Sequence, residues 1–185
     1  MEFTRVDRDG ELLIITLARG KANPLNAAMV EELITAFGAA SGDDVRAVVF
    51  ASDRPKFFSS GFDVVEVFAY DRDRMKEFFS RFIDLYEAML HLPKPVVAAV
   101  SGHAFAGGAV LALACDSRVM AEGEFGFALN EVNLGIVVPP GFIRMAVAAV
   151  GEKNARDHPG RKDHLAGEGF GDGVGGRGGI SRNRA

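Results

Sequence analysis

An uncharged stretch over 95–115 constrains the fold of this chain more than any other feature. It begins with PVVAAV, an apolar run whose β-branched residues predict a buried strand. A Ser-Gly turn follows, and then Gly107 and Gly108 lead into a helix of small residues. Glycines at a helix start expose backbone N–H groups, and the helix dipole adds partial positive charge there. The stretch therefore predicts a strand, a turn and a helix whose first amides can bind an anion.

A single carboxylate follows this helix in an otherwise apolar neighbourhood. Glu131 stands within the segment 125–138, which is rich in Phe, Val, Leu and Ile. An anion-binding helix start and an isolated carboxylate are the groups that proton abstraction next to a carbonyl needs. By spacing alone, however, Glu131 can equally be an ordinary loop carboxylate, and Gly107 and Gly108 can serve only helix–strand packing.

Composition places the chain among ordinary globular proteins. It has 185 residues, 48% of them apolar and 25% charged, and a net charge of −4, which argues against a nucleic-acid-binding protein. The one cysteine, Cys115, is expected to be a buried structural thiol, and it fits a reducing compartment. No secretory signal is recognised at the N-terminus, so we expect a cytoplasmic protein without a membrane span. The four histidines lack ligand spacing, so no metal is expected.

Strands and helices are expected to alternate along the chain. The expected strands cover 3–7, 11–17, 45–51, 95–100, 118–121 and 124–128, and the expected helices cover 27–40, 72–92, 109–115 and 139–150 or 140–150. Asn26 is a suitable N-cap for the first helix. The alternation predicts an α/β fold with parallel pairing. The loops at the strand ends should then bring together Asn23, Phe62, Gly107 and Glu131.

The last segment, 157–185, does not continue this pattern. It has nine glycines between Gly160 and Gly179, several arginines and few large apolar residues. We therefore expect a core domain over 1–156 and a disordered Gly/Arg-rich tail, a composition that can also contact nucleic acid. We favour a second hypothesis for the origin of this tail, a shift of the reading frame near Arg156. Reading one nucleotide later permits IILAGKTISPEKALEMGLVDEVV, an amphipathic segment, and sequencing the gene would decide between the two.

Four sequence blocks, in this order, resemble the crotonase superfamily, the enoyl-CoA hydratase/isomerase group. They are NPLN (23–26), FFSSGFD (57–63), KPVVAAVSGHAFAGG (94–108) and NEVNLGI (130–136). The resemblance implies an α/β, crotonase/ClpP-like spiral of ββα units, commonly assembled as homotrimers, whose C-terminal helical part is missing here. It also implies an acyl-CoA thioester partner and no separate cofactor, because coenzyme A is part of the substrate.

The resemblance also assigns roles to individual residues. The amides of Phe62 and Gly107 would form an oxyanion hole, and Glu131 would move the proton. Val110 occupies the position where the family's hydratases carry another glutamate. This pattern resembles the isomerases that shift a 3-enoyl-CoA double bond to the 2-position. Further substrate-binding positions implied by the resemblance are Lys21, Ala22, Leu25, Ser60, Gly61, Asp63, Val64, Phe105 and Gly108.

Several alternatives stay open at this point. A hydratase-like lyase would need a group other than Val110 to activate water, and an inactive acyl-CoA-binding remnant is a third candidate. Asp63 is expected to cap a short helix, and Asp116 to make structural hydrogen bonds. The charges most suited to CoA phosphates, or equally to plain solvent exposure, are those of Arg19, Lys21 and Lys56.

Overall fold

A computed structural model describes residues 1–151, so the predicted tail over 157–185 lies outside the described residues. The larger of two sheets has five strands in the order β1-β2-β3-β5-β7. Their bounds are β1 (Thr4–Asp9), β2 (Leu12–Leu17), β3 (Ala47–Ser52), β5 (Val96–Val100) and β7 (Ser117–Met120). β1 and β2 form an antiparallel hairpin, and every later neighbour is parallel. The predicted hairpin and parallel strands are thus confirmed.

A second, smaller sheet consists of β4 (Phe57–Ser59), β6 (His103–Phe105) and β8 (Phe127–Ala128), all parallel. The odd-numbered strands β3, β5 and β7 lie in the large sheet, and the next strand of the chain always lies in the small one. After β4 and after β6, helices return the chain to the large sheet. The architecture is therefore a spiral of ββα units, as the resemblance implied.

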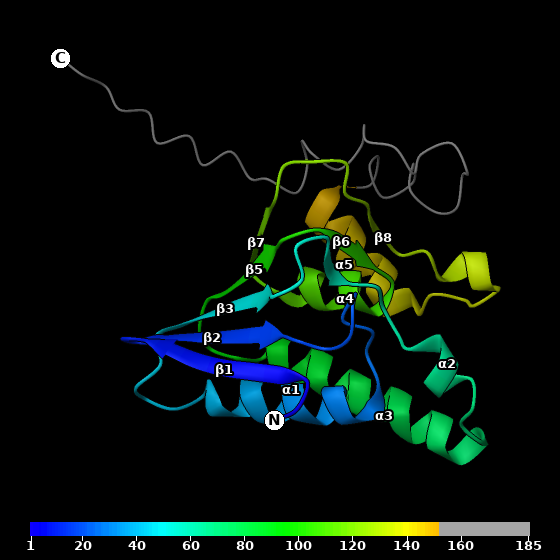
Figure 1. Ribbon diagram of the computed structural model, residues 1–185, viewed down its shortest axis with the longest axis horizontal. Helices are drawn as coiled ribbons and strands as arrows, with labels where there is room; N and C mark the ends of the chain where they lie inside the picture. The colour runs from blue at the N-terminus through cyan, green and yellow to red at the C-terminus, as the bar shows by residue number, and fades with distance from the viewer. Residues whose placement is uncertain (152–185) are drawn as a thin grey trace.

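Helices follow each strand pair. They are α1 (Ala27–Ala39), α2 (Val64–Val67), α3 (Arg72–Leu90), α4 (Gly107–Ala114) and α5 (Pro140–Val150), with a 3-10 turn, η1, over Glu131–Leu134. Figure 1 shows α1 and α3 side by side along the β1–β2 part of the large sheet, and α4 next to α5. No helix of residues 1–151 is both long and apolar enough to cross a membrane.

The predicted helix ends are largely confirmed by their caps. Asn26 Oδ1 accepts a hydrogen bond from the Met29 amide at 3.0 Å and so begins α1. Pro140 occupies the first turn of α5, where its missing N–H is harmless. The helix expected over 72–92 ends at Leu90 and buries Phe78 and Phe82. The neighbouring Phe79 and Ile83 are 36% and 45% exposed.

Aromatic packing joins the two sheets to α1. The Phe37 and Phe50 rings meet edge to face at 5.4 Å, and Phe50 meets Phe58 in the same way at 5.2 Å. All three side chains are buried. Such pairs stabilise beyond their buried area. Because Phe58 belongs to β4, this cluster fixes the strand that leads into the loop at 60–63.

The C-terminal end of α4 is capped by Arg118, whose Nη1 donates to the carbonyls of Ala112, Leu113 and Cys115 at 3.3, 3.3 and 2.7 Å. These carbonyls lie at the end of the helix, where most acceptors lack an intrahelical partner; that of Ala112 also accepts from the Cys115 amide at 3.4 Å. We expect Arg118→Met to lower the free energy of unfolding by about 1–3 kcal/mol, measured by urea denaturation, because hydrogen bonds from a charged donor are lost. The exposed Arg72→Met is the control, with an expected change within about 0.5 kcal/mol. Equal losses in both variants would contradict this role of Arg118.

Candidate functional site

The loop after β4 is bonded to the segment before α1. The Leu25 amide donates to the Gly61 carbonyl, and the Asp63 amide donates to the Leu25 carbonyl, both at 2.8 Å. This is a parallel bridge between Leu25 and Phe62. In such a bridge the amide of the second residue points away from the first. Among the described residues, none accepts a hydrogen bond from the Phe62 amide.

The N-terminus of α4 lies directly beside this loop. Gly107 is the first helical residue, so its amide has no acceptor in the preceding turn. A Cβ on Gly61 would lie 3.5 Å from the Gly107 nitrogen and 2.9 Å from the Phe105 carbonyl oxygen. Gly61 also has φ +90°, which favours glycine. The amides of Phe62 and Gly107 therefore come from two backbone segments in close contact.

The position of Glu131 is set by the small sheet. The Ala106 amide donates to the Ala128 carbonyl at 2.8 Å, so β8 ends beside the start of α4. Three residues later Glu131 opens η1, and only 8% of this residue is exposed. Its Oε2 is buried and has no hydrogen-bond partner among the described residues. Desolvation by burial raises the pKa of the Glu131 carboxyl, although a bond from its own amide opposes this rise.

An unpartnered buried carboxyl oxygen is costly, and its presence suggests a group that a ligand completes. In chemical terms the site has a carboxyl in a poorly solvated place and a helix start with free amides. A carboxylate of raised pKa is a stronger base than a solvated one. Amides that point at a common place stabilise negative charge on an oxygen.

Asn23, which was expected near these groups, is hydrogen-bonded to the strand that leads into the Phe62 loop. It is fully buried with φ +48°. Its Nδ2 donates to Ser52 Oγ and the Phe58 carbonyl, and its own carbonyl accepts from Ser59 Oγ at 2.8 Å. Asn23 thus supports the loop after β4.

The remaining positions assigned by resemblance are divided between surface and interior. Leu25 is fully buried with both backbone groups bonded, and Gly108 is buried against Ser59, so both support the loop. The exposed positions are Lys21 and Val64, and the half-buried ones are Ala22, Ser60, Asp63 and Phe105. Lys56 is exposed, whereas the Arg19 guanidinium is bonded to Asp63.

Three residues with expected structural roles have them. The Asp63 side chain accepts from the Glu66 amide and caps α2. Asp116 Oδ2 accepts from the Val96 amide at 2.7 Å. The Cys115 thiol is buried, and desolvation raises its pKa to about 12, so it is a poor nucleophile.

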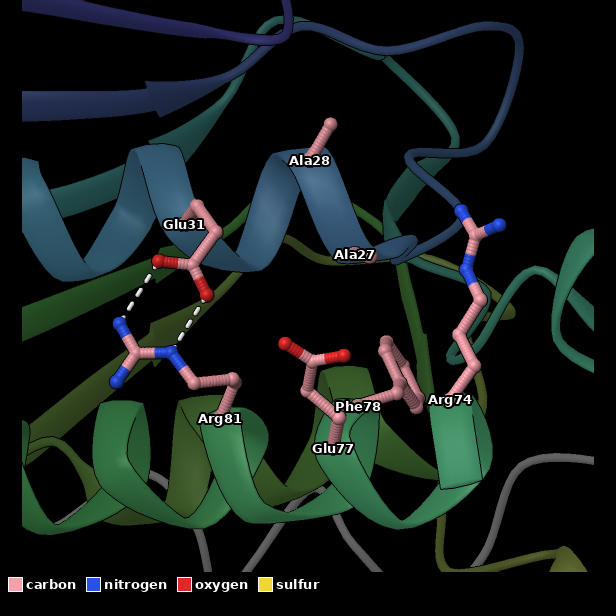
Figure 2. Close-up of a pocket in the computed structure, with 7 residues that line it drawn as sticks. All are labelled: Ala27, Ala28, Glu31, Arg74, Glu77, Phe78 and Arg81. Atoms are coloured by element: carbon pink, nitrogen blue, oxygen red, sulfur yellow. Dashed lines mark hydrogen bonds and ion pairs between the residues drawn. The ribbon is translucent and has the colours of Figure 1, made fainter. Parts of the chain in front are cut away.

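A separate surface cavity of about 320 Å³ lies between α1 and α3 (Figure 2). Glu77 points into it, and at one end Arg81 binds Glu31 through two hydrogen bonds of 2.6 and 2.7 Å. None of its lining residues is a predicted site residue. Over residues 1–151 there is no group of three or more His, Cys, Asp or Glu side chains that could hold a metal ion.

Comparison with known proteins agrees with this fold. The family model "Enoyl-CoA hydratase/isomerase" matches residues 7–159, so the chain belongs to that family. A carnitinyl-CoA dehydratase of Salmonella enteritidis is 39% identical over 144 residues, which are 76% of this chain and 53% of that protein. The chain thus spans about half the length of the curated relatives it matches.

Solved structures show the same fold. An enoyl-CoA hydratase from Bacillus anthracis superposes with a TM-score of 0.79 at 29% identity, over 84% of this chain and 61% of that one. The human mitochondrial delta3-delta2-enoyl-CoA isomerase gives a TM-score of 0.80 at 25% identity, over 84% and 62%. Hydratases and isomerases thus share this architecture, and the choice between them depends on the site residues.

Proposed function

We propose that this chain is an acyl-CoA isomerase that moves a 3-enoyl-CoA double bond to the 2-position. The supporting observation is the lone buried carboxyl of Glu131, whose Oε2 has no partner among the described residues. It accompanies two segments whose Phe62 and Gly107 amides have no acceptor there. Coenzyme A is part of the substrate and no separate cofactor is required.

In the proposed reaction the thioester oxygen accepts hydrogen bonds from the Phe62 and Gly107 amides. Glu131, as a carboxylate, removes a proton from C2. The electron pair forms a dienolate whose negative charge develops on the thioester oxygen, where each donor contributes about 3–4 kcal/mol. Glu131 then returns the proton to C4, and the double bond becomes conjugated with the carbonyl.

Val110 favours isomerisation over hydration. Its side chain is buried in α4 at 1% exposure, at the position where resemblance to the hydratases would put another glutamate. An apolar side chain cannot activate water, whereas isomerisation needs one base that serves twice. A lyase is the second candidate, because the Salmonella relative is named a dehydratase. For the whole protein we further propose family-like homotrimers, provided that a family-like C-terminal part is present.

A direct assay separates these candidates. The chain is incubated with trans-3-hexenoyl-CoA, and the conjugated 2-enoyl thioester is followed by its ultraviolet absorbance; crotonyl-CoA serves as the hydration substrate. Isomerisation without hydration is the expected result. Hydration alone would favour the lyase, and acyl-CoA binding without either reaction would identify an inactive remnant.

The pH dependence of kcat/KM follows from the burial of Glu131. Burial raises the pKa of its carboxyl above the ordinary 4.5, and only the ionised form can take a proton from C2. We therefore expect kcat/KM to fall as the pH is lowered, with a midpoint above 4.5. Stopped-flow or steady-state rates measured from pH 4 to 8 check this. A flat profile across that range would contradict the role of Glu131 as the base.

A further inference from the structure

The Arg19 side chain forms hydrogen bonds to both segments of the Leu25–Phe62 bridge. Its Nη1 donates to the Pro24 carbonyl and to Asp63 Oδ2, each at 2.8 Å, and its Nη2 lies 3.5 Å from Glu66 Oε2. The Arg19 side chain is 16% exposed and that of Asp63 is 19% exposed. The ion pair is therefore mostly shielded from solvent, where it is screened less than a surface pair.

Asp63 immediately follows Phe62 and takes part in three hydrogen bonds. Its amide donates to the Leu25 carbonyl, one carboxyl oxygen accepts from the Glu66 amide, and the other accepts from Arg19. Burial opposes ionisation of this carboxyl, but the Arg19 and Glu66 hydrogen bonds outweigh it and lower the pKa of Asp63. Asp63 is therefore ionised, and its hydrogen bonds fix the residue that follows Phe62.

The same network extends to the start of α1. Asn26, the N-cap of that helix, donates through Nδ2 to Glu66 Oε2 at 2.8 Å. The Tyr70 hydroxyl donates to the other Glu66 oxygen at 2.6 Å. This network of contacts connects the end of β2, the start of α1 and helix α2. Arg19 lies at one end of the network, and the peptide group of Phe62 is surrounded by it.

We propose that Arg19 is a positioning residue, which fixes the direction of the Phe62 amide through Asp63 and the Pro24 carbonyl. This inference rests on the proposed function, because it matters only where that amide binds a thioester oxygen. Without the guanidinium, Asp63 is left as a poorly solvated carboxylate, which relaxes by turning toward water. Asp63 directly follows Phe62, and the Pro24 carbonyl shares a peptide group with the Leu25 amide that bonds the Gly61 carbonyl. Both changes therefore turn the Gly61–Phe62 peptide, and its amide loses its alignment with the Gly107 amide.

The test compares four variants of the full chain: Arg19→Met, Arg19→Lys, Asp63→Asn and Arg81→Met. Arg81→Met is the control, since Arg81 of α3 also binds a carboxylate of another element, that of Glu31 in α1, at a more exposed place (Figure 2) that has none of the predicted site residues. We expect Arg19→Met to reduce kcat by about 100-fold with KM nearly unchanged, as for a misplaced transition-state contact. Arg19→Lys keeps the positive charge but not the planar guanidinium with its several donors, so its kcat should lie between those of Arg19→Met and the unaltered chain.

A second readout does not depend on turnover. Butyryl-CoA labelled with carbon-13 at the thioester carbonyl has no double bond to move, and its bound C=O stretch reports polarisation by the amides. In the unaltered chain and in Arg81→Met the stretch should shift to lower frequency on binding. Arg19→Met and Asp63→Asn should show a smaller shift, and circular dichroism confirms that each is folded.

The outcomes separate this inference from the proposed function. A full C=O shift and full kcat in a folded Arg19→Met or Asp63→Asn would overturn the positioning role and leave the isomerase proposal intact. A loss of equal size in Arg81→Met would also overturn it, because the effect would then be general destabilisation. If the unaltered chain bound butyryl-CoA without any shift, the oxyanion hole and the role of Arg19 would both be rejected.

Discussion

Replacing Glu131 by Gln is expected to abolish isomerisation while leaving acyl-CoA binding intact. The Gln amide has nearly the shape of the carboxyl, so the packing of the buried site is preserved. The amide cannot, however, accept and return a proton at neutral pH. Positioned acid–base groups contribute about 100- to 10,000-fold, and here one group performs both transfers. We therefore expect a loss at the upper end of that range. The rate with trans-3-hexenoyl-CoA and the Kd of butyryl-CoA measure the two properties separately.

Glu124→Gln is the matched control for this substitution. Glu124 is an exposed carboxylate in the segment that leads into β8, so it has the same chemistry without the burial. Its removal should leave turnover unchanged. Retained turnover in Glu131→Gln would rule out the role of Glu131 as the base, and lost binding would indicate that its carboxylate holds the ligand.

Glu131→Gln should also stabilise the folded chain at neutral pH. A carboxyl with a raised pKa binds its proton more tightly when folded, so the free energy of unfolding falls as the pH rises through that pKa. A neutral amide removes this dependence. Urea denaturation at pH 4 and pH 7 should therefore show a loss of stability in the original chain that is smaller in the variant. A gain in stability together with a loss of activity is typical of functional residues.

The sequence predicted best those parts of the fold in which local signals agree with the tertiary structure. Helix α1 begins where Asn26 can cap it, and its buried Met29, Leu33 and Phe37 follow the helical period. The strand at 95–100 and the glycine-led helix after it were found from β-branched and small residues alone. In these segments propensity, pattern and caps all point to the same structure.

Strands β4 and β6 were missed for a physical reason. Each has only three residues, too few for an alternating pattern, and each exists because a parallel neighbour completes its hydrogen bonds. The segment 52–61, for which no strand was predicted, therefore contains β4. That strand is important for the site because it positions the peptide of Phe62 beside the start of α4.

The candidate site was predictable only in its chemistry-bearing groups. Glu131 stood out as a charge among apolar residues, and the free amides of α4 followed from its glycines. The pair of Arg19 and Asp63 is separated by 44 positions in the chain, and no local pattern connects the two residues. Contacts of this kind depend on the fold, so a sequence can supply the reacting groups without showing what orients them.

Gly108→Ala is expected to impair both stability and turnover, because it pushes α4 away from β4. A Cβ at this position would lie 2.5 Å from Ser59 Cβ and 2.8 Å from the Ser59 carbonyl oxygen. Backbone has to move to accommodate it, and overpacking of this kind costs about 1–3 kcal/mol. Because Gly107 moves with the helix, its amide shifts relative to that of Phe62, and a shift of about 1 Å lowers kcat by about 100-fold.

Gly38→Ala separates this steric effect from the general effect of replacing a helical glycine. Gly38 lies in α1, and a Cβ at this position would have no neighbouring atom within 4 Å among the described residues. Alanine there should stabilise the chain by about 0.5–1 kcal/mol through backbone entropy. Urea denaturation and turnover are measured for both variants. If Gly108→Ala were as stable and as active as Gly38→Ala, the contact of α4 with Ser59 would not set the distance between the two amides.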